Sequence, residues 1–322
     1  MNKGSKIYVA GHKGLAGSAI VRELERKGYT RIIKLTRDKC DLRDPEAVYY
    51  LFETQKPEYV FMAAAHAGGI KRAIDFPVEM QVDNIRIQTN ILECAKDFRA
   101  KKLIFLSSSC VYPVDAYQPY KEEYIGTGKT DENWSYALAK LAGTELCRAY
   151  HRQYGCNFMT VVPCNMYGIN DNFDLEYSHV IPALIRKFHE CETVEVWGGR
   201  KIIDGEKYYY TPAREFLFSD DFARAVVMLM ETKDYEDLYN GVINIGAGDE
   251  TEIATLVDIT EDIVSPGKKV VWNREKPFGV NSKLMDSGRI RAMGWEPKVG
   301  LREGVSRVYV WYKERVSTSS CF

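Results

Sequence analysis

A tyrosine and a lysine four residues apart carry the clearest chemical signal in this sequence. Tyr136 and Lys140 form a YxxxK motif in residues 135–150, where apolar residues recur with helical spacing. Residues four apart share one face of a helix, and an ammonium group near a phenol lowers the pKa of the phenol. We therefore expect Tyr136 to act as a general acid and base. The alternative is a surface Tyr/Lys pair, because the motif alone is common.

Three consecutive serines favour the catalytic interpretation. Ser107, Ser108 and Ser109 follow residues 103–106, an apolar run with strand character. Ligands of α/β sheets bind at the carboxyl ends of the strands. A serine at that place can donate a hydrogen bond to a substrate oxygen.

A glycine-rich turn near the N-terminus predicts a dinucleotide site. Gly11, Gly14 and Gly17 follow the apolar run at residues 6–10 and begin a segment with helical periodicity. Glycines allow a tight turn and close approach to a pyrophosphate, and the helix N-terminus supplies amides and a favourable dipole. The spacing is GxxGxxG, so an ordinary strand-to-helix turn is the alternative. The strand and the amphipathic helix on either side favour binding.

The residues after the second predicted strand, 32–35, indicate the cofactor. NAD enzymes use an acidic residue there for the ribose 2′-hydroxyl, whereas arginine accommodates the 2′-phosphate of NADP. Arg37 precedes Asp38, and Lys13 lies inside the glycine turn. We predict that Arg37 and Lys13 bind the 2′-phosphate of NADP(H). The alternative is that both are solvated charges and that Asp38 binds NAD.

Alternating strands and helices must position these residues. Strands are expected at residues 6–10, 32–35, 59–63, 103–106 and 158–162, with helices between them. This rhythm predicts an α/β fold, a Rossmann-type doubly wound parallel sheet. It breaks after Gly168 and returns in a helix at 220–230 and a strand at 242–245. We predict a Rossmann domain of residues 1–167 with 218–247, and a smaller α/β substrate lobe of residues 168–217 and 248–322.

Composition excludes several functions. The 322 residues include 44 lysines and arginines against 45 acidic residues, so no basic surplus indicates nucleic acid or a membrane surface. The eight cysteines form no CxxC pair, which argues against a zinc site. They predict reduced thiols of a cytoplasmic protein. We expect no metal, no secretion signal and no transmembrane span.

These motifs occur in the order typical of the extended short-chain dehydrogenase/reductase superfamily, and longer segments resemble one family within it. The chain resembles the GDP-L-fucose synthase family from about residue 6 to residue 311. That family converts GDP-4-keto-6-deoxy-D-mannose by 3,5-epimerisation and then NADPH-dependent reduction of the C4 ketone. The segments are VAGHKG at 9–14, AAAHAGGI at 63–70, SSCVYP at 108–113, NMYG at 165–168, SHVIPAL at 178–184, REFL at 214–217 and KLMD at 283–286.

The resemblance implies a role for individual residues. Ser108, Tyr136 and Lys140 match the reductase triad, whereas Cys110 and His179 match the acid/base pair of the epimerase. The matches to substrate-binding positions are Asn165, Lys187, Trp197, Arg214 and Lys283. The matches to cofactor-binding positions are Gly11, Lys13, Gly14, Leu15, Gly17, Arg37, Tyr136, Lys140, Pro163, Asn165 and His179. Members of the superfamily often dimerise, so we expect a homodimer with a four-helix bundle formed by residues 84–98 and 135–150 of two copies.

The residue types suit this chemistry. A C4 ketone acidifies the hydrogens on C3 and C5, so each carbon can invert through an enolate with a base on one face and an acid on the other. Cysteine and histidine, with ordinary pKa values of ~8.5 and ~6.5, titrate in the useful range. Ser108 and Tyr136 can hold the enolate oxygen. The alternatives are a buried structural thiol at Cys110 and a helix-end histidine at His179.

Two features depart from the family pattern. A basic, aromatic insertion intervenes at residues 198–213, where it could form a lid or a base-stacking surface, and His66 replaces a common lysine. One competing function is a nucleotide-sugar 4-reductase or 4-epimerase without 3,5-epimerase activity. Another is an NADP-sensing regulator with a vestigial site. The joint presence of Ser108, Tyr136 and Lys140 argues against the regulator.

Overall fold

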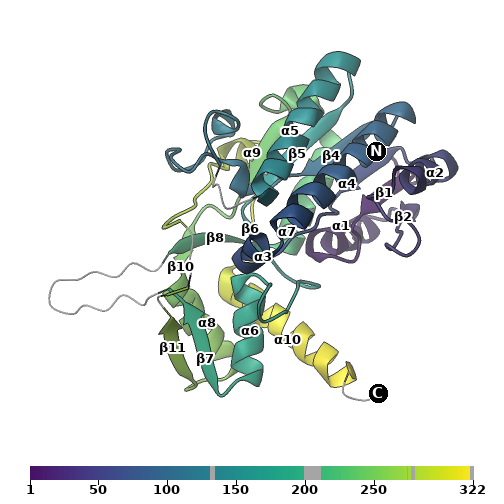
Figure 1. Ribbon diagram of the computed structural model, residues 1–322. Coiled ribbons are helices and arrows are strands. Elements are labelled where there is room, and N and C mark those ends of the chain that lie inside the picture. The colour runs from purple at the N-terminus through teal and green to yellow at the C-terminus, as the bar shows by residue number, and fades with distance from the viewer. Residues whose placement is uncertain (131–134, 199–211, 274, 277–279, 320–322) are drawn as a thin grey trace.

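A parallel sheet forms the centre of the larger lobe (Figure 1). The computed structural model of the protein describes residues 1–130, 135–198, 212–273, 275–276 and 280–319. Six parallel strands lie in the order β2-β1-β3-β4-β5-β9. The predicted Rossmann-type fold is therefore confirmed. The strands are β1 (Ile7–Ala10), β2 (Ile32–Ile33), β3 (Tyr59–Met62), β4 (Lys102–Leu106), β5 (Phe158–Pro163) and β9 (Val242–Ile245).

Helices cover both faces of this sheet. Side chains of a strand alternate between its faces: Ile7 and Val9 join one core cluster, and Tyr8 and Ala10 join the other. Burial on both faces is typical of parallel strands and accounts for their nearly continuous apolar sequences. The first cluster includes residues of α1 (Leu15–Arg26) and α7 (Ser219–Thr232), and the second includes residues of α2 (Pro45–Gln55), α4 (Pro77–Asp97) and α5 (Ser135–Tyr154).

Two boundaries differ from the sequence-based expectation. β2 comprises two residues, whereas a strand was expected over residues 32–35. The helix expected from residue 84 begins at Pro77, because proline is favoured in the first turn of a helix. It follows the short helix α3 (Ile70–Asp75), which the sequence analysis missed.

The smaller lobe has sheets and a core of its own. β6 (Asn165–Tyr167), β8 (Ala213–Phe218) and β10 (Glu250–Glu252) form one sheet, and β7 (Thr193–Trp197) pairs with β11 (Lys269–Asn273). The lobe boundaries stay a prediction, and residues 199–211 of the insertion lie outside the described residues. A separate apolar core includes residues of α6 (Val180–Glu190), α8 (Ile253–Val264) and α10 (Leu301–Ser319).

Shorter elements complete the described chain. They are the 3₁₀ turns η1 (Ser109–Val111), η2 (Glu122–Tyr124) and η3 (Tyr235–Asp237) and the helix α9 (Gly288–Ala292). Of the helices in the described part, none is both long and apolar enough to cross a membrane.

Helices α4 and α5 pack together on one side of the sheet (Figure 1). Some of their apolar side chains are exposed. Leu138 on α5 is 49% exposed, and Val78 and Val82 on α4 are 65% and 36% exposed. Both helices were expected to form a dimer interface. The apolar side chains at their surface suit that role.

We predict a dimer of the 36.8 kDa chain, joined through α4 and α5. Leu138→Glu should yield monomers, because it would bury a carboxylate between apolar helices. Val310→Glu on α10 is the matched control, since Val310 is also 49% exposed, and it should remain dimeric. Light scattering gives the mass. A wild-type mass of a single chain at micromolar concentration would contradict the prediction.

Candidate active site

The glycine turn lies where β1 meets α1, and two of its glycines are required by close contacts. Gly11 has φ +79°, and a Cβ there would lie 2.8 Å from the backbone of Ala64. A Cβ on Gly17 would lie 2.2 Å from the carbonyl oxygen of Gly11. Gly14 caps α1, which begins at Leu15. The first amides of a helix have no partner within it, so the turn can hold a pyrophosphate.

Charged residues follow β2, and Lys13 lies within the glycine turn itself. Arg37 is 71% exposed, and its Nε lies 3.3 Å from Oδ2 of Asp41. A hydrogen bond from Thr36 lowers the pKa of Asp38, and the charge of Lys13 lowers it further. The charge of Lys13 thus acts on Asp38, the residue that follows Arg37 in the sequence. Both an acidic and a basic partner are available to a ribose at this place.

Lys140 connects α5 to the end of β4. Its Nζ is buried and donates a hydrogen bond of 2.7 Å to the carbonyl oxygen of Leu106, the last residue of β4. The same Nζ lies 5.6 Å from the centre of the Tyr136 ring. Two residues beyond Leu106, Ser108 accepts a hydrogen bond of 3.5 Å from the amide of Cys110. The structure therefore brings Ser108, Tyr136, Lys140 and Cys110 together.

Burial decides the protonation of the YxxxK pair. The sequence analysis expected Lys140 to lower the pKa of Tyr136, but burial raises it instead. Burial also lowers the pKa of Lys140 to about 8. The expectation is wrong because loss of water disfavours the charged form of both groups. At neutral pH Tyr136 holds its proton and can donate it.

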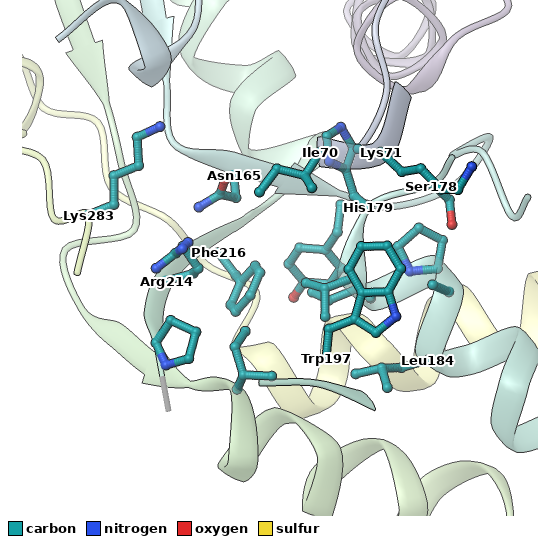
Figure 2. A pocket seen from close by; sticks show the side chains of 18 of the residues that line it. Ile70, Lys71, Asn165, Ser178, His179, Leu184, Trp197, Arg214, Phe216 and Lys283 are labelled. Atoms are coloured by element: carbon teal, nitrogen blue, oxygen red, sulfur yellow. The ribbon is translucent and has the colours of Figure 1, made fainter. Parts of the chain in front are cut away.

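A pocket of about 280 Å³ adjoins this group. Ser108, Tyr136 and Lys140 do not line it, but Cys110 does and interacts electrostatically with Tyr136 and Lys140. Figure 2 shows Arg214 and Lys283 at one end of the pocket and Trp197 at the other. The predicted epimerase and substrate residues all line the pocket: Cys110, His179, Asn165, Lys187, Trp197, Arg214 and Lys283. Of the predicted cofactor residues, Pro163 is the last residue of β5 and does not line the pocket.

His179 and Cys110 are both uncharged at neutral pH. His179 precedes the first turn of α6 and lines the pocket next to Ser178 (Figure 2). Burial lowers the pKa of His179 and raises the pKa of the Cys110 thiol. A neutral imidazole can accept a proton and a neutral thiol can donate one. The pair can therefore move protons at carbon.

A buried carboxylate that the sequence analysis missed holds the cationic end of the pocket. Glu215 accepts hydrogen bonds from the amides of Gly248 and Met285, at 2.7 Å and 3.1 Å. Burial raises its pKa to about 7. These bonds join β8, which carries Arg214, to the segment that carries Lys283. The only signal in the sequence was the position of Glu215 within the REFL segment.

The opposite end combines an indole ring with amines. Lys187 donates a hydrogen bond of 2.8 Å from Nζ to the carbonyl oxygen of Glu195. Trp197 donates one of 3.2 Å from Nε1 to Oε1 of Glu195, and Nζ of Lys276 lies 5.7 Å from the centre of a Trp197 ring. Such an end suits a planar base with an attached phosphate. Within the described ranges, no three His, Cys, Asp or Glu side chains gather as a metal site would require.

The glycine turn, the Ser-Tyr-Lys group and the adjoining pocket define a short-chain dehydrogenase/reductase with a nucleotide-sugar site. The chain belongs to the NAD dependent epimerase/dehydratase family, whose model matches residues 7–246. Within it, the chain is an enzyme of the GDP-L-fucose synthase type. GDP-L-fucose synthase 1 of Arabidopsis thaliana is 42% identical over 323 residues, covering 98% of this chain and 95% of the relative.

Solved structures of similar enzymes have the same fold. A GDP-6-OMe-4-keto-L-xylo-heptose reductase from Campylobacter jejuni is 33% identical and superposes with a TM-score of 0.91, over 98% of this chain and 99% of its own. MlghC, a GDP-mannoheptose C4 reductase from the same organism with NADP bound, is 33% identical with a TM-score of 0.85. That match covers 97% of this chain and 99% of MlghC.

We predict that kcat/KM for NADPH falls above a pH of about 8, because Lys140 then loses its charge. Lys140→Arg keeps a positive charge at that pH, so its profile should lose this fall even if its maximum is lower. The measurement is the pH profile of kcat/KM for both forms. A wild-type profile that is flat to about pH 9.5 would rule out a titrating lysine.

Proposed function

We propose that the protein converts GDP-4-keto-6-deoxy-D-mannose to GDP-L-fucose, by epimerisation at C3 and C5 and then reduction of the C4 ketone with NADPH. One observation carries this proposal: Cys110 and His179 line a single pocket directly beside Ser108, Tyr136 and Lys140. Proton transfer at carbon and at oxygen can therefore act on one bound sugar.

Epimerisation depends on hydrogen bonds to the C4 oxygen. Ser108 and Tyr136 hydrogen-bond this oxygen, which stabilises the negative charge that develops on it. The neutral imidazole of His179 removes a proton from carbon, and the electrons of the C–H bond form the enolate. The Cys110 thiol gives a proton to the opposite face of that carbon, which inverts the centre. Once His179 has released its proton to water and the Cys110 thiolate has taken one up from water, the same two transfers invert the other carbon.

Reduction depends on the same hydrogen bonds to the C4 oxygen. When bound, NADPH supplies a hydride to C4. Tyr136 donates its phenolic proton to the C4 oxygen, and the charged Lys140 stabilises the phenolate that remains. Because burial favours the protonated phenol before the reaction, the enzyme starts with the acid that reduction consumes.

The charges around the two sites support the choice of ligands. Arg37 and Lys13 offer positive charge next to the ribose-binding end of the glycine turn, which favours a 2′-phosphate. Three cations on the pocket wall, Lys187, Arg214 and Lys283, offset the charge of a sugar diphosphate. Trp197 offers a face for the guanine base.

A second candidate is a GDP-sugar 4-reductase without epimerase activity. It is favoured by the likeness to two Campylobacter jejuni enzymes that are named as reductases of heptose derivatives. Incubation with GDP-4-keto-6-deoxymannose and NADPH, followed by NMR of the product, separates the two functions. GDP-L-fucose supports the bifunctional proposal. A product with the original configuration at C3 and C5 supports the plain reductase.

Replacing Cys110 should separate the two reactions. Cys110→Ser keeps the shape, but its hydroxyl is a poor acid and base, so deuterium uptake at C3 and C5 in D₂O should fall by about 100-fold. Reduction of substrate that is already epimerised should fall much less, because Ser108 and Tyr136 remain. Cys156→Ser, a half-buried thiol outside the pocket, is the control. Uptake at the wild-type rate in Cys110→Ser would disprove the role of the thiol.

Replacing Arg37 should change the cofactor preference. Arg37→Ala should weaken NADPH binding by roughly one to two decades and leave NADH binding nearly unchanged, because only NADPH carries the 2′-phosphate. Arg26→Ala removes a similarly exposed arginine with an acidic partner, 65% against 71% exposed, and should affect neither cofactor. Titration by fluorescence gives both dissociation constants. An equal loss for both cofactors would exclude a contact with the 2′-phosphate.

A further inference from the structure

The segment that carries His179 has no regular structure of its own and rests on the loop after β3. The amide of Gly69 donates a hydrogen bond of 2.8 Å to the carbonyl oxygen of Tyr177. A Cβ on Gly69 would lie 2.5 Å from the carbonyl oxygen of Ser178. The two backbones therefore touch directly at the residues just before His179.

The side chain of Tyr177 packs against residues of α3. Its ring lies below two cations, with Nζ of Lys71 at 4.8 Å and Cζ of Arg72 at 5.8 Å from the ring centre. The ring of Phe76 packs edge-on at 5.7 Å. The Tyr177 hydroxyl is 3.4 Å from Oδ2 of Asp75, a weaker contact. Cations over an aromatic face are attracted by its quadrupole. The cation–π contacts with Lys71 and Arg72 are therefore the main interactions of the Tyr177 ring.

His66 in turn holds Arg72. Nη2 of Arg72 donates to Nε2 of His66 at 2.5 Å, so this nitrogen must be the unprotonated one. Nδ1 of His66 faces Oδ2 of Asp83 at 3.5 Å, and that carboxylate also accepts a hydrogen bond of 3.0 Å from Arg43. A lysine at position 66 has no acceptor and would repel Arg72. His66 thus provides an acceptor for Arg72 that a lysine at position 66 would lack.

We propose that His66, Arg72 and Tyr177 are positioning residues that fix the His179 segment against the loop after β3, so that the His179 ring faces the reacting carbons. This inference rests on the proposed epimerase function. The cluster lies at the pocket edge, where Ile70 and Lys71 are close to Ser178 and His179 (Figure 2). The reductase group is held separately by β4 and α5.

This separation makes the positioning role measurable. A small displacement of His179 should lower proton transfer at carbon steeply, because a shift of about 1 Å can cost 100-fold in rate. Ser108, Tyr136 and Lys140 keep their own supports, so hydride transfer should depend little on the cluster. A role in overall stability would lower both activities together.

The first test replaces Tyr177. Tyr177→Ala should lower deuterium uptake at C3 and C5 by about tenfold or more, while reduction of already epimerised substrate falls less than about threefold. Tyr177→Phe keeps the ring face and should stay within about threefold of wild type in both assays. Tyr117→Ala, which removes a tyrosine that is 86% exposed, is the control. Equal losses in both assays, or normal uptake in Tyr177→Ala, would overturn the proposal.

The second test replaces His66 and needs no substrate. His66→Lys should increase amide hydrogen exchange in residues 174–183, measured by mass spectrometry, because two cations repel. His66→Gln offers an oxygen to Arg72 and should restore the wild-type exchange. Unchanged amide exchange in both His66→Lys and Tyr177→Ala would disprove the positioning role. If the wild-type protein takes up no deuterium at C3 or C5, the epimerase function itself fails, and this second test still decides the positioning role.

Discussion

A buried ammonium group must find acceptors inside the protein, and this requirement organises the reactive centre. Lys140 finds the carbonyl of Leu106, which ties α5 to the end of β4. The approach is possible because position 143 is glycine, since a Cβ there would lie 2.4 Å from the ring of Phe105. Ser108 and Cys110 come shortly after Leu106 in the chain, so the bond also holds them close to Tyr136. The hydrogen bond between Lys140 and Leu106 therefore links the YxxxK motif of α5 to the SSC sequence that follows β4.

The sequence was informative wherever chemistry and local geometry coincide. The glycine turn, the strand ends and the YxxxK helix follow from short spacings, and the segments resembling the family placed Cys110 and His179 in one pocket. The predicted direction of the Tyr136 pKa shift was wrong, because the burial of Tyr136 depends on how α5 packs against the rest of the protein. The contacts of Glu215 and Arg72 were missed for a related reason. Met285 lies far from Glu215 in the sequence, and His66 meets Arg72 only because of how the loop before α3 folds.

Burial shifts the pKa values of the acids and of the base near the pocket in opposite directions, and both shifts favour the uncharged form. It raises the pKa of Tyr136 and Cys110 and lowers the pKa of His179. All three groups are therefore neutral before the reaction, and no net charge opposes proton movement among them. The positive charge needed to attract a diphosphate comes from side chains elsewhere on the pocket wall. In the proposed reactions, electrostatic binding and proton transfer thus depend on different residues.

The two proposed reactions depend on different parts of the fold. The grip on the ketone oxygen belongs to β4 and α5, which the large sheet supports on its own. His179 comes from the start of α6, and the residues just before it contact the loop after β3 at Gly69. Loss of that contact would remove proton transfer at carbon before it affected hydride transfer at C4. One architecture is therefore compatible both with enzymes that epimerise and reduce and with the Campylobacter jejuni enzymes named as reductases.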